Sequence, residues 1–424
     1  MAAATGRRAT TAILDPARYR RRALAIGLLV VAAIDLLLLA RGISGSLRTT
    51  FVLSGGTSVH LPVLALPSRL TCIVAGIVTA ALGVLQLVRR SSENSSLVIG
   101  AGLALFGIAF LTWAGAGKSV DFVGLLATSL VEAVPLTLGA LSGVVCERAG
   151  VINIAIEGQF LVAAFFAAVV SSATHDLWLG LVAGTLSGAL MALVLAVFTI
   201  TYRADQIIVG IVLDAFALGL TSFLLHSLLV PFQSQLNSSG VFRPIAIPVL
   251  DRTPVIGSVL FDQNVLVYLT ILILIAVQIG LFQTRWGLRA RAVGEHPRAA
   301  DTVGIDVERV RYVNVLIGGL IAGVGGASFT VGATGQFSDN MTAGLGYIAL
   351  AAMIFGRWRP LGAVVAAVLF GFTDSLQFTF SVLGVPIPSP ILTMFPYLAT
   401  IVAVAGLIGQ VRPPAADGMP YVRE

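Results

Sequence analysis

Ionisable and amide side chains interrupt the apolar runs of this sequence. The stretch CERAGVINIAIEGQF, residues 146–160, carries Glu147, Arg148, Asn153 and Glu157. A charge at the centre of a membrane helix costs roughly 2.5–3.5 kcal/mol on insertion scales, so such groups normally face protein or a water-filled path. Asn153 and Glu157 are four residues apart and would share one face of a helix. They are predicted either to line a translocation path or to clamp two helices together by hydrogen bonds.

Three other carboxylates also lie inside apolar runs. Glu132 precedes the helix-bending Pro135, and Asp214 and Asp374 lie in later runs. Each is a candidate contact for a solute or a structural partner for a neighbouring helix. Glu147 and Arg148 stand at a predicted helix end, where charges can reach water, and are assigned structural roles. The predicted substrate pathway therefore comprises Glu132, Asn153, Glu157, Asp214 and Asp374.

The sequence lacks the residues that a metal site, a catalytic site or a phosphate-binding loop would need. The four histidines and two cysteines are widely spaced, so no metal site is expected. No cluster has catalytic spacing, and the chain is not expected to be an enzyme. The segment WAGAGKS lacks the first glycine of a phosphate-binding loop because Thr112 occupies that position. No cofactor is expected.

The elements that position these side chains must be membrane helices. Of the 424 residues, 57% are hydrophobic and 11% are charged, against about 25% charged in a soluble domain. Runs of about 20 apolar residues span a bilayer as helices, which satisfy their own backbone hydrogen bonds. The expected crossings are 23–40, 70–88, 97–115, 123–145, 152–172, 177–200, 205–229, 264–283, 312–332, 361–380 and 391–409.

A shorter apolar segment, 344–356, lies beside Gly335, Gly344 and Gly346 and suggests a discontinuous helix. The predicted fold is an all-α polytopic transmembrane helix bundle of about 11–12 membrane segments. With a cytoplasmic N-terminus and 344–356 counted as a crossing, 20 of the 26 Lys and Arg residues lie inside, as the positive-inside rule expects. The net charge of +6 thus reflects orientation in the cell membrane, and no nucleic-acid partner is expected.

Four regions are predicted: a basic cytoplasmic N-terminus (1–22), accessory transmembrane helices (23–115), a core domain (116–410) and a cytoplasmic tail (411–424). The core contains the charged cytoplasmic loop 285–311. Within this loop, Pro297 suits the first turn of a short helix and Gly304 the position after its end. Ala299, Ala300 and Val303 would then form a small apolar face that fits a groove on a cytoplasmic partner. The alternative is a solvated connector.

Three stretches resemble the nucleoside-type branch of the ATP-binding-cassette permeases for branched-chain amino acids and simple sugars. They are ATSLVEAVPLTLGALSG followed by ERAGVINIAIEGQ, the coupling-loop run LRARAVGEHPRAADTVGI, and GLGYIALAAMIFGRWRPLGAVVAAVLFG. One departure is Ala155, where the family often has glycine. The resemblance implies that the loop docks an ATPase through Arg291, Gly294, Glu295, Ala299, Ala300 and Gly304.

The resemblance also implies a function: a permease subunit of an ATP-driven importer for a nucleoside or related small solute. Its implied partners are a cytoplasmic ATP-binding subunit, a second and non-identical permease subunit, and an extracytoplasmic solute-binding protein that docks on the outer loop 230–263. A sugar or branched-chain amino acid permease is the near alternative. An ion-coupled secondary transporter is the distant one, with the pathway carboxylates as its relay.

Overall fold

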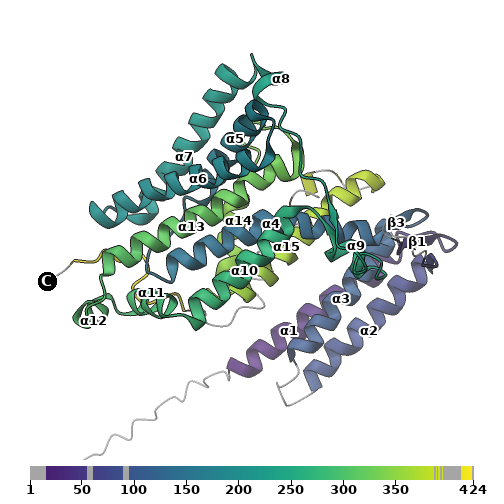
Figure 1. Ribbon diagram of the computed structural model, residues 1–424. Helices are drawn as coiled ribbons and strands as arrows, with labels where there is room; N and C mark the ends of the chain where they lie inside the picture. The colour runs from purple at the N-terminus through teal and green to yellow at the C-terminus, as the bar shows by residue number, and fades with distance from the viewer. Residues whose placement is uncertain are drawn as a thin grey trace, which may run out of the picture. The chain divides into compact units, whose positions relative to one another are not determined.

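The computed structural model describes residues 16–54, 61–88, 95–385 and 412–422, with a few isolated residues between 386 and 394. The chain is predominantly helical and forms two compact units (Figure 1). One unit is made largely of residues before Val123. The other contains Val123–Val382 and the C-terminal segment 412–422.

The first unit combines three helices with a small sheet. The helices are α1 (Pro16–Ile34), continued by the π-helical turn η1 (Asp35–Leu39), α2 (Ser68–Val88) and α3 (Ser95–Ala114). Strands β1 (Arg48–Val52), β2 (Leu64–Pro67) and β3 (Ser119–Asp121) pair in the order β2-β1-β3, antiparallel and then parallel. Leu39, Cys72 and Ala109 belong to the core of this unit. The sheet was not foreseen from the sequence, where its strands are too short to give a pattern.

The second unit contains the remaining long helices. They are α4 (Phe122–Glu147), α5 (Ile156–Thr174), α6 (Leu177–Ala196), α7 (Gln206–Leu224), α10 (Val265–Gln283), α13 (Val307–Phe329) and α15 (Pro360–Leu383). Helices α6, α7 and α13 end in π-helical turns, η2 (Val197–Thr201), η3 (Leu225–Leu229) and η4 (Thr330–Thr334). The shorter elements are α8 (Gln233–Leu236), β4 (Ile245–Ala246), α9 (Ile256–Leu260), β5 (Asp262–Gln263), α11 (Arg285–Glu295), α12 (Pro297–Thr302) and α14 (Leu345–Phe355).

Small residues bring the central helices of this unit together. A Cβ atom added to Gly188 of α6 would lie 2.5 Å from the Cα atom of Gly323 on α13, and one added to Gly319 would lie 2.3 Å from the Ala192 methyl group. Glycines at such crossings let backbones approach closely in a membrane, where the hydrophobic effect does not drive helices together. The backbones of α6 and α13 therefore lie very close together.

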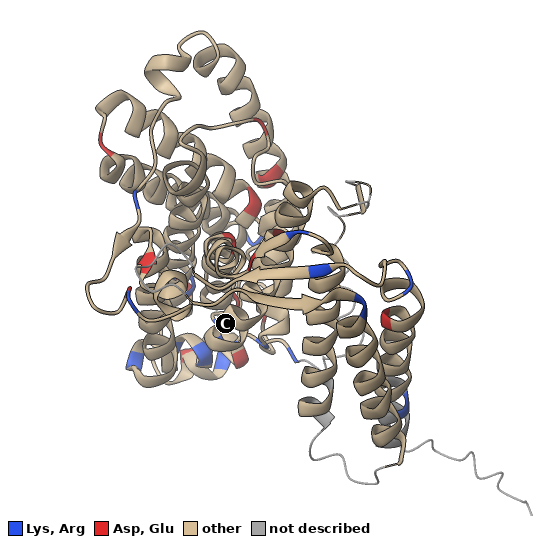
Figure 2. Cartoon of the chain, turned by 90° about the vertical axis from the view of Figure 1, so that its right-hand side faces the viewer, with Lys and Arg blue, Asp and Glu red and all other residues tan. Residues whose placement is uncertain are grey.

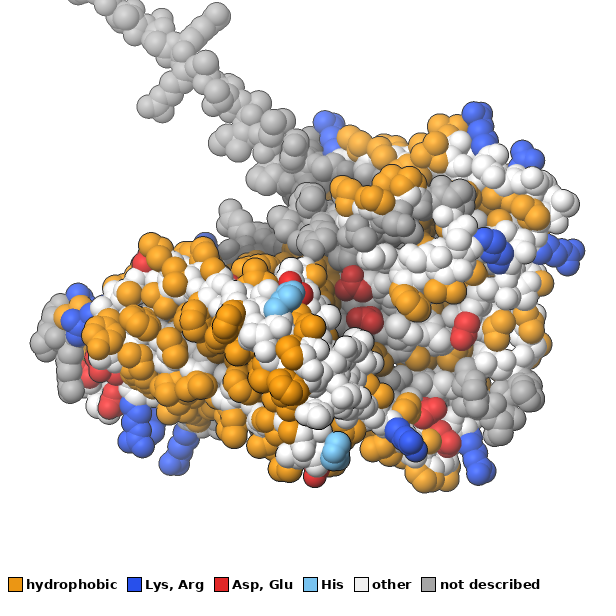
Figure 3. Space-filling view, turned by 90° about the horizontal axis from the view of Figure 1, so that it is seen from above, with side chains coloured by type: hydrophobic (Ala, Val, Ile, Leu, Met, Phe, Trp, Pro, Cys, Tyr) orange, Lys and Arg blue, Asp and Glu red, His pale blue; other side chains and the backbone are white. Residues whose placement is uncertain are grey.

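The predicted crossings agree with these helices. Eight described helices are long and apolar enough to span a membrane, and apolar parts of α1 with η1 and of α3 account for the first and third predicted crossings. The predicted crossing 391–409 and the basic N-terminus lie largely outside the described residues. Large hydrophobic side chains remain exposed on the helices and cover much of the surface in Figure 3. The chain is therefore an all-α, multi-pass membrane protein.

Candidate functional site

A break in the chain near the cytoplasmic end of α4 sets up the polar centre of the second unit. After Glu147, Gly150 adopts a positive φ of 83°, and helix α5 begins only at Ile156. The residues between them re-enter the unit without helical structure. The prediction that Asn153 and Glu157 share a helical face is therefore wrong, because Asn153 precedes the helix.

Helix α14 is a half-helix that meets this break. Its 11 residues are about 16 Å long at 1.5 Å per residue, roughly half of the 30 Å hydrocarbon core. It starts after Gly344, whose φ is 85°. The predicted discontinuous segment is thus present.

Glu157 forms hydrogen bonds with the beginning of α14. One carboxylate oxygen accepts hydrogen bonds from the Thr342 hydroxyl at 2.5 Å and the Gly344 amide at 2.8 Å, and the other accepts from the Gly346 amide at 2.7 Å. A helix start has unpaired amides and a partial positive charge, so a buried carboxylate from another helix stabilises it. A Cβ atom at Gly346 would lie 2.6 Å from the Glu157 amide nitrogen, so the approach requires glycine.

Asp214 of α7 completes this arrangement. Its carboxylate accepts hydrogen bonds from the Gly158 amide at 2.7 Å and from the Tyr347 hydroxyl at 2.8 Å. Asp214 lies eight residues into α7, about 12 Å along the helix. The node formed by Glu157, Asp214, Thr342 and Tyr347 therefore lies near the middle of the membrane, where transporters place their broken helices.

Asn153 belongs to a separate buried pair. Its amide nitrogen donates to Ser142 on α4 and to Gln159 on α5, both at 3.2 Å, and the Gln159 amide donates back at 3.1 Å. None of the three side chains is exposed. Asn153 therefore ties the re-entrant residues to two helices.

Glu132 and Asp374 are placed differently from the other pathway candidates. They lie on α4 and α15, which touch where a Cβ atom at Gly371 would come within 2.7 Å of the Ala133 amide nitrogen. Glu132 is exposed, Asp374 is partly buried, and neither has a hydrogen-bond partner among the residues that the structure describes. The structure thus separates this pair from the Glu157 node.

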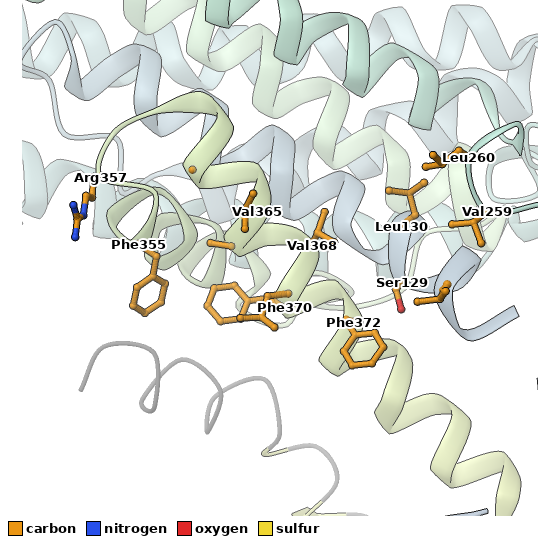
Figure 4. Close-up of a pocket in the computed structure, with 14 residues that line it drawn as sticks. Ser129, Leu130, Val259, Leu260, Phe355, Arg357, Val365, Val368, Phe370 and Phe372 are labelled. Atoms are coloured by element: carbon orange, nitrogen blue, oxygen red, sulfur yellow. The ribbon is translucent and has the colours of Figure 1, made fainter. Parts of the chain in front are cut away.

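A cavity of about 690 Å³ lies beside the same two helices. Figure 4 shows its lining side chains, which include Leu130, Val259, Val365, Val368 and Phe372 and are almost all apolar. A polar solute requires convergent hydrogen-bonding groups in its site. This cavity therefore does not have the chemistry of a solute site.

Contacts between distant loops form the surface that carries α11 and α12. Glu147 accepts a hydrogen bond from the Trp358 indole at 2.5 Å, and Arg148 donates to the Trp358 carbonyl at 2.9 Å. The residues after α14 therefore return to the end of α4. In the cartoon of Figure 2, several Lys and Arg positions (blue) lie together at one end of this unit.

The predicted coupling residues lie on α11 and α12. Arg291 lies over the Phe282 ring at 5.0 Å. Gly294 packs so tightly that a Cβ atom would lie 2.3 Å from the Arg148 carbonyl oxygen. Pro297 begins α12, and Gly304 follows it with a φ of 84°.

The predicted apolar face of α12 needs one correction. Ala299 and Val303 are exposed, but Ala300 is only 4% exposed. It packs instead with Val293, Val307 and Tyr421 of the same chain. Helix α12 has only six residues, so residue spacing alone does not show which of its residues face the protein and which face solvent.

Several structural partners were missed from the sequence. Thr342, Tyr347, Trp358 and the C-terminal segment carry no motif, and they reach the site only through tertiary contacts. In the part of the chain that the structure describes, no three His, Cys, Asp or Glu side chains form a group that could hold a metal ion.

Comparison with known proteins places this architecture in a family. The pattern of the family described as "Branched-chain amino acid transport system / permease component" matches residues 125–408. No solved structure matches the chain.

Several curated relatives are similar to this chain. The guanosine ABC transporter permease protein NupQ of Bacillus subtilis is 40% identical over 309 residues, covering 70% of this chain and 95% of its own. The nucleoside ABC transporter permease protein NupC of Lactococcus lactis is 39% identical, covering 70% and 96%. The putative glucose ABC transporter permease protein TsgC13 of Haloferax volcanii is 35% identical, covering 60% and 77%. More distantly, the guanosine permease protein NupP of Bacillus subtilis is 26% identical, covering 61% and 74%.

Proposed function

Because this chain belongs to the branched-chain amino acid transport system permease component family, we propose that it translocates nucleosides as a membrane-spanning subunit of an ATP-driven importer in the cell membrane. The family match over residues 125–408 carries this proposal. Transport, not catalysis, is then its role. ATP hydrolysis takes place in a separate cytoplasmic subunit.

The solute class follows from the names of the relatives. NupQ and NupC, at 40% and 39% identity, are named for guanosine and nucleosides. TsgC13, at 35%, is named for glucose. A nucleoside contains a sugar ring, so one polar path accommodates features of both. NupQ and NupC have a higher identity than TsgC13 and cover a larger part of this chain, so we favour a nucleoside as the solute.

Three protein partners complete the importer. The ATPase subunit docks on α12 through the exposed Ala299 and Val303. A solute-binding protein docks on the outer loop 230–263, where Val249 is 75% exposed and has a strained φ of 75°. A second, non-identical permease subunit is supported by NupP and NupQ, two guanosine permease proteins of one organism that are both similar to this chain.

Within the permease, the five pathway candidates have two roles. Asn153, Glu157 and Asp214 each make two or three hydrogen bonds to the protein, so they hold the re-entrant residues and α14 in place. Glu132 and Asp374 accept no hydrogen bond from the residues that the structure describes. Ribose hydroxyls are donors that pair with such acceptors, and these two carboxylates are therefore assigned to the solute path.

The test is uptake of labelled guanosine into vesicles that contain the complete importer. Uptake is expected to require ATP, and Glu132→Gln and Asp374→Asn are each expected to lower it roughly tenfold without lowering membrane abundance, because loss of a charged acceptor costs about 1.5–3 kcal/mol. Glu308→Gln, an exposed site on α13, is the control. Uptake that proceeds without nucleotide would rule out the ATP-driven importer, and normal uptake by both variants would remove them from the path.

A further inference from the structure

The C-terminal segment, residues 412–422, is bound to the surface that carries α12. The backbone amide of Ala416 donates to the Gly294 carbonyl at 2.8 Å, and the amide of Ala415 donates to the Glu295 carboxylate at 3.3 Å. Tyr421 is 9% exposed and packs against Ala300. The segment therefore covers the side of α12 that faces the protein and leaves Ala299 and Val303 outside.

A buried arginine explains why the segment stays there. Arg311 of α13 is 1% exposed, and one of its terminal nitrogens donates to the Met419 carbonyl at 2.9 Å. The negative charge of Asp417 also favours the charged form of Arg311. A buried charge is costly unless it is compensated, so removal of the segment would take away both the Met419 acceptor and this opposite charge.

The same carboxylate reaches a third element. Asp417 lies beside the carboxyl group of Glu147, the last residue of α4, and the two groups interact electrostatically. Through Asp417, Met419 and Tyr421 the segment joins the cytoplasmic ends of α4, α12 and α13. A force applied to this segment would therefore act directly on two membrane-spanning helices.

A groove lies between the segment and the start of α12. It has a volume of about 590 Å³, the space of roughly twenty water molecules at about 30 Å³ each. Met419 and Val422, which are 58% and 50% exposed, stand on one wall, and residues 295–299 form the other. Its lining is largely apolar, and it is continuous with the exposed face of α12.

We propose that residues 412–422 and α12 form one composite docking platform, and that the ATPase subunit seats an apolar side chain in the groove between them. The proposal rests on the proposed function, in which α12 binds that subunit. A partner that contacts Ala299 on the groove wall lies against Met419 and Val422 as well. The C-terminal segment thus transmits the motion of the ATPase to α4 and α13.

The test is copurification of the ATPase subunit with the full-length permease from membranes. Met419→Asp and Val422→Asp introduce a charge at exposed positions and are each expected to reduce bound ATPase roughly tenfold or more, as loss of an apolar anchor does. Tyr202→Asp, at another exposed site (70%) next to the cytoplasmic Arg203, is the matched control and should retain binding.

Val303→Arg separates this proposal from the proposed function. Loss of ATPase with Val303→Arg but normal binding by both aspartate variants would overturn the composite platform and leave α12 as the dock. Normal binding by Val303→Arg would contradict docking on α12, and with it the composite platform, whereas the ATP-driven importer is tested separately by the nucleotide dependence of uptake. If the aspartate variants are poorly produced, a photo-crosslinking amino acid in place of Val422 replaces them. A crosslink to the ATPase supports the platform, whereas a crosslink only to lipid or to a permease subunit overturns it.

Discussion

Glu157 accepts three hydrogen bonds from the beginning of α14, whereas Glu132 on α4 receives none from the described residues. Both carboxylates stand in apolar helices, and by residue type they are equivalent. A carboxylate that accepts three hydrogen bonds from the protein has little capacity left for a solute. The two carboxylates differ in their neighbours, and this difference is why we propose only Glu132 of the two as a contact for the solute.

Replacement of Glu157 tests this distinction. Glu157→Gln keeps the shape but removes the charge and turns an amide group toward backbone donors, so at least one buried N–H loses its acceptor. We expect a loss of about 2–3 kcal/mol in stability and a lower melting temperature of the detergent-purified protein. Glu308→Gln, which is exposed, should melt like the parent chain. An unchanged melting temperature with impaired uptake would instead return Glu157 to the solute path.

Helices α6 and α13 owe their contact to residues without side chains. Gly188 and Gly323 lie face to face, and a Cβ atom on Gly188 would also come within 2.8 Å of the Gly319 carbonyl oxygen. Backbone atoms cannot yield as a flexible side chain can. The spacing of these elements is therefore set by glycine on both sides, and it positions the helices that surround the half-helix α14.

A pair of glycine substitutions isolates this effect. Gly188→Ala should destabilise the protein by about 1–3 kcal/mol, as overpacking in a tight core does. Gly219→Ala on α7 has open space around the added methyl group and should be neutral or stabilising by up to about 1 kcal/mol, since alanine favours helix. Thermal unfolding of both variants in the same detergent measures the difference. Equal melting temperatures would show that α6 and α13 are not held at this distance.

The two ends of the second unit have different kinds of surface. The membrane-facing helices expose large apolar side chains, while the cytoplasmic end carries arginines and the bound C-terminal segment. Burial raises the pKa of Asp417 in this segment from 3.8 to about 6. Glu147, the Gly418 amide and the Arg311 guanidinium each lower this pKa, but burial outweighs them. Protonation of Asp417 is therefore linked to docking of the segment.

The sign of the pH dependence follows from that raised pKa. The docked segment binds the Asp417 proton more tightly than the released one, so docking is strongest below about pH 4, weakens as the pH rises to about 6, and levels off above it. A spin label at Val422→Cys measures the equilibrium between the docked and the released segment. Docking should be roughly tenfold weaker at pH 7 than at pH 4. A pKa difference of about two units would allow a change of roughly a hundredfold, but solvent screens the site and reduces the effect. The native cysteines Cys72 and Cys146 are buried. In Asp417→Asn the pH dependence should be much weaker, with Glu147 as the remaining titrating group, and an unchanged profile would assign the titration to a group other than Asp417.

The sequence alone determined the class of the molecule and its place in the membrane. Long apolar runs have one structural solution in lipid, because unpaired backbone groups are costly there, and this local rule predicted the crossings and the short segment that became α14. The short helix after Pro297 followed from equally local signals, a proline at its start and a glycine beyond its end.

Tertiary structure decided what each polar side chain does. Ala299 and Ala300 are adjacent and identical in type, yet one is exposed and the other lies beneath Tyr421, more than a hundred residues away. Asn153 and Glu157 fit a helical spacing, but Gly150 turns the chain so that only Glu157 lies on the helix. Hydrogen bonding and burial depend on which distant residues come into contact, and no spacing along the chain encodes that contact. Membership of the permease family was therefore readable from the sequence. The proposed division of the polar residues into structural clamps and solute contacts required the fold.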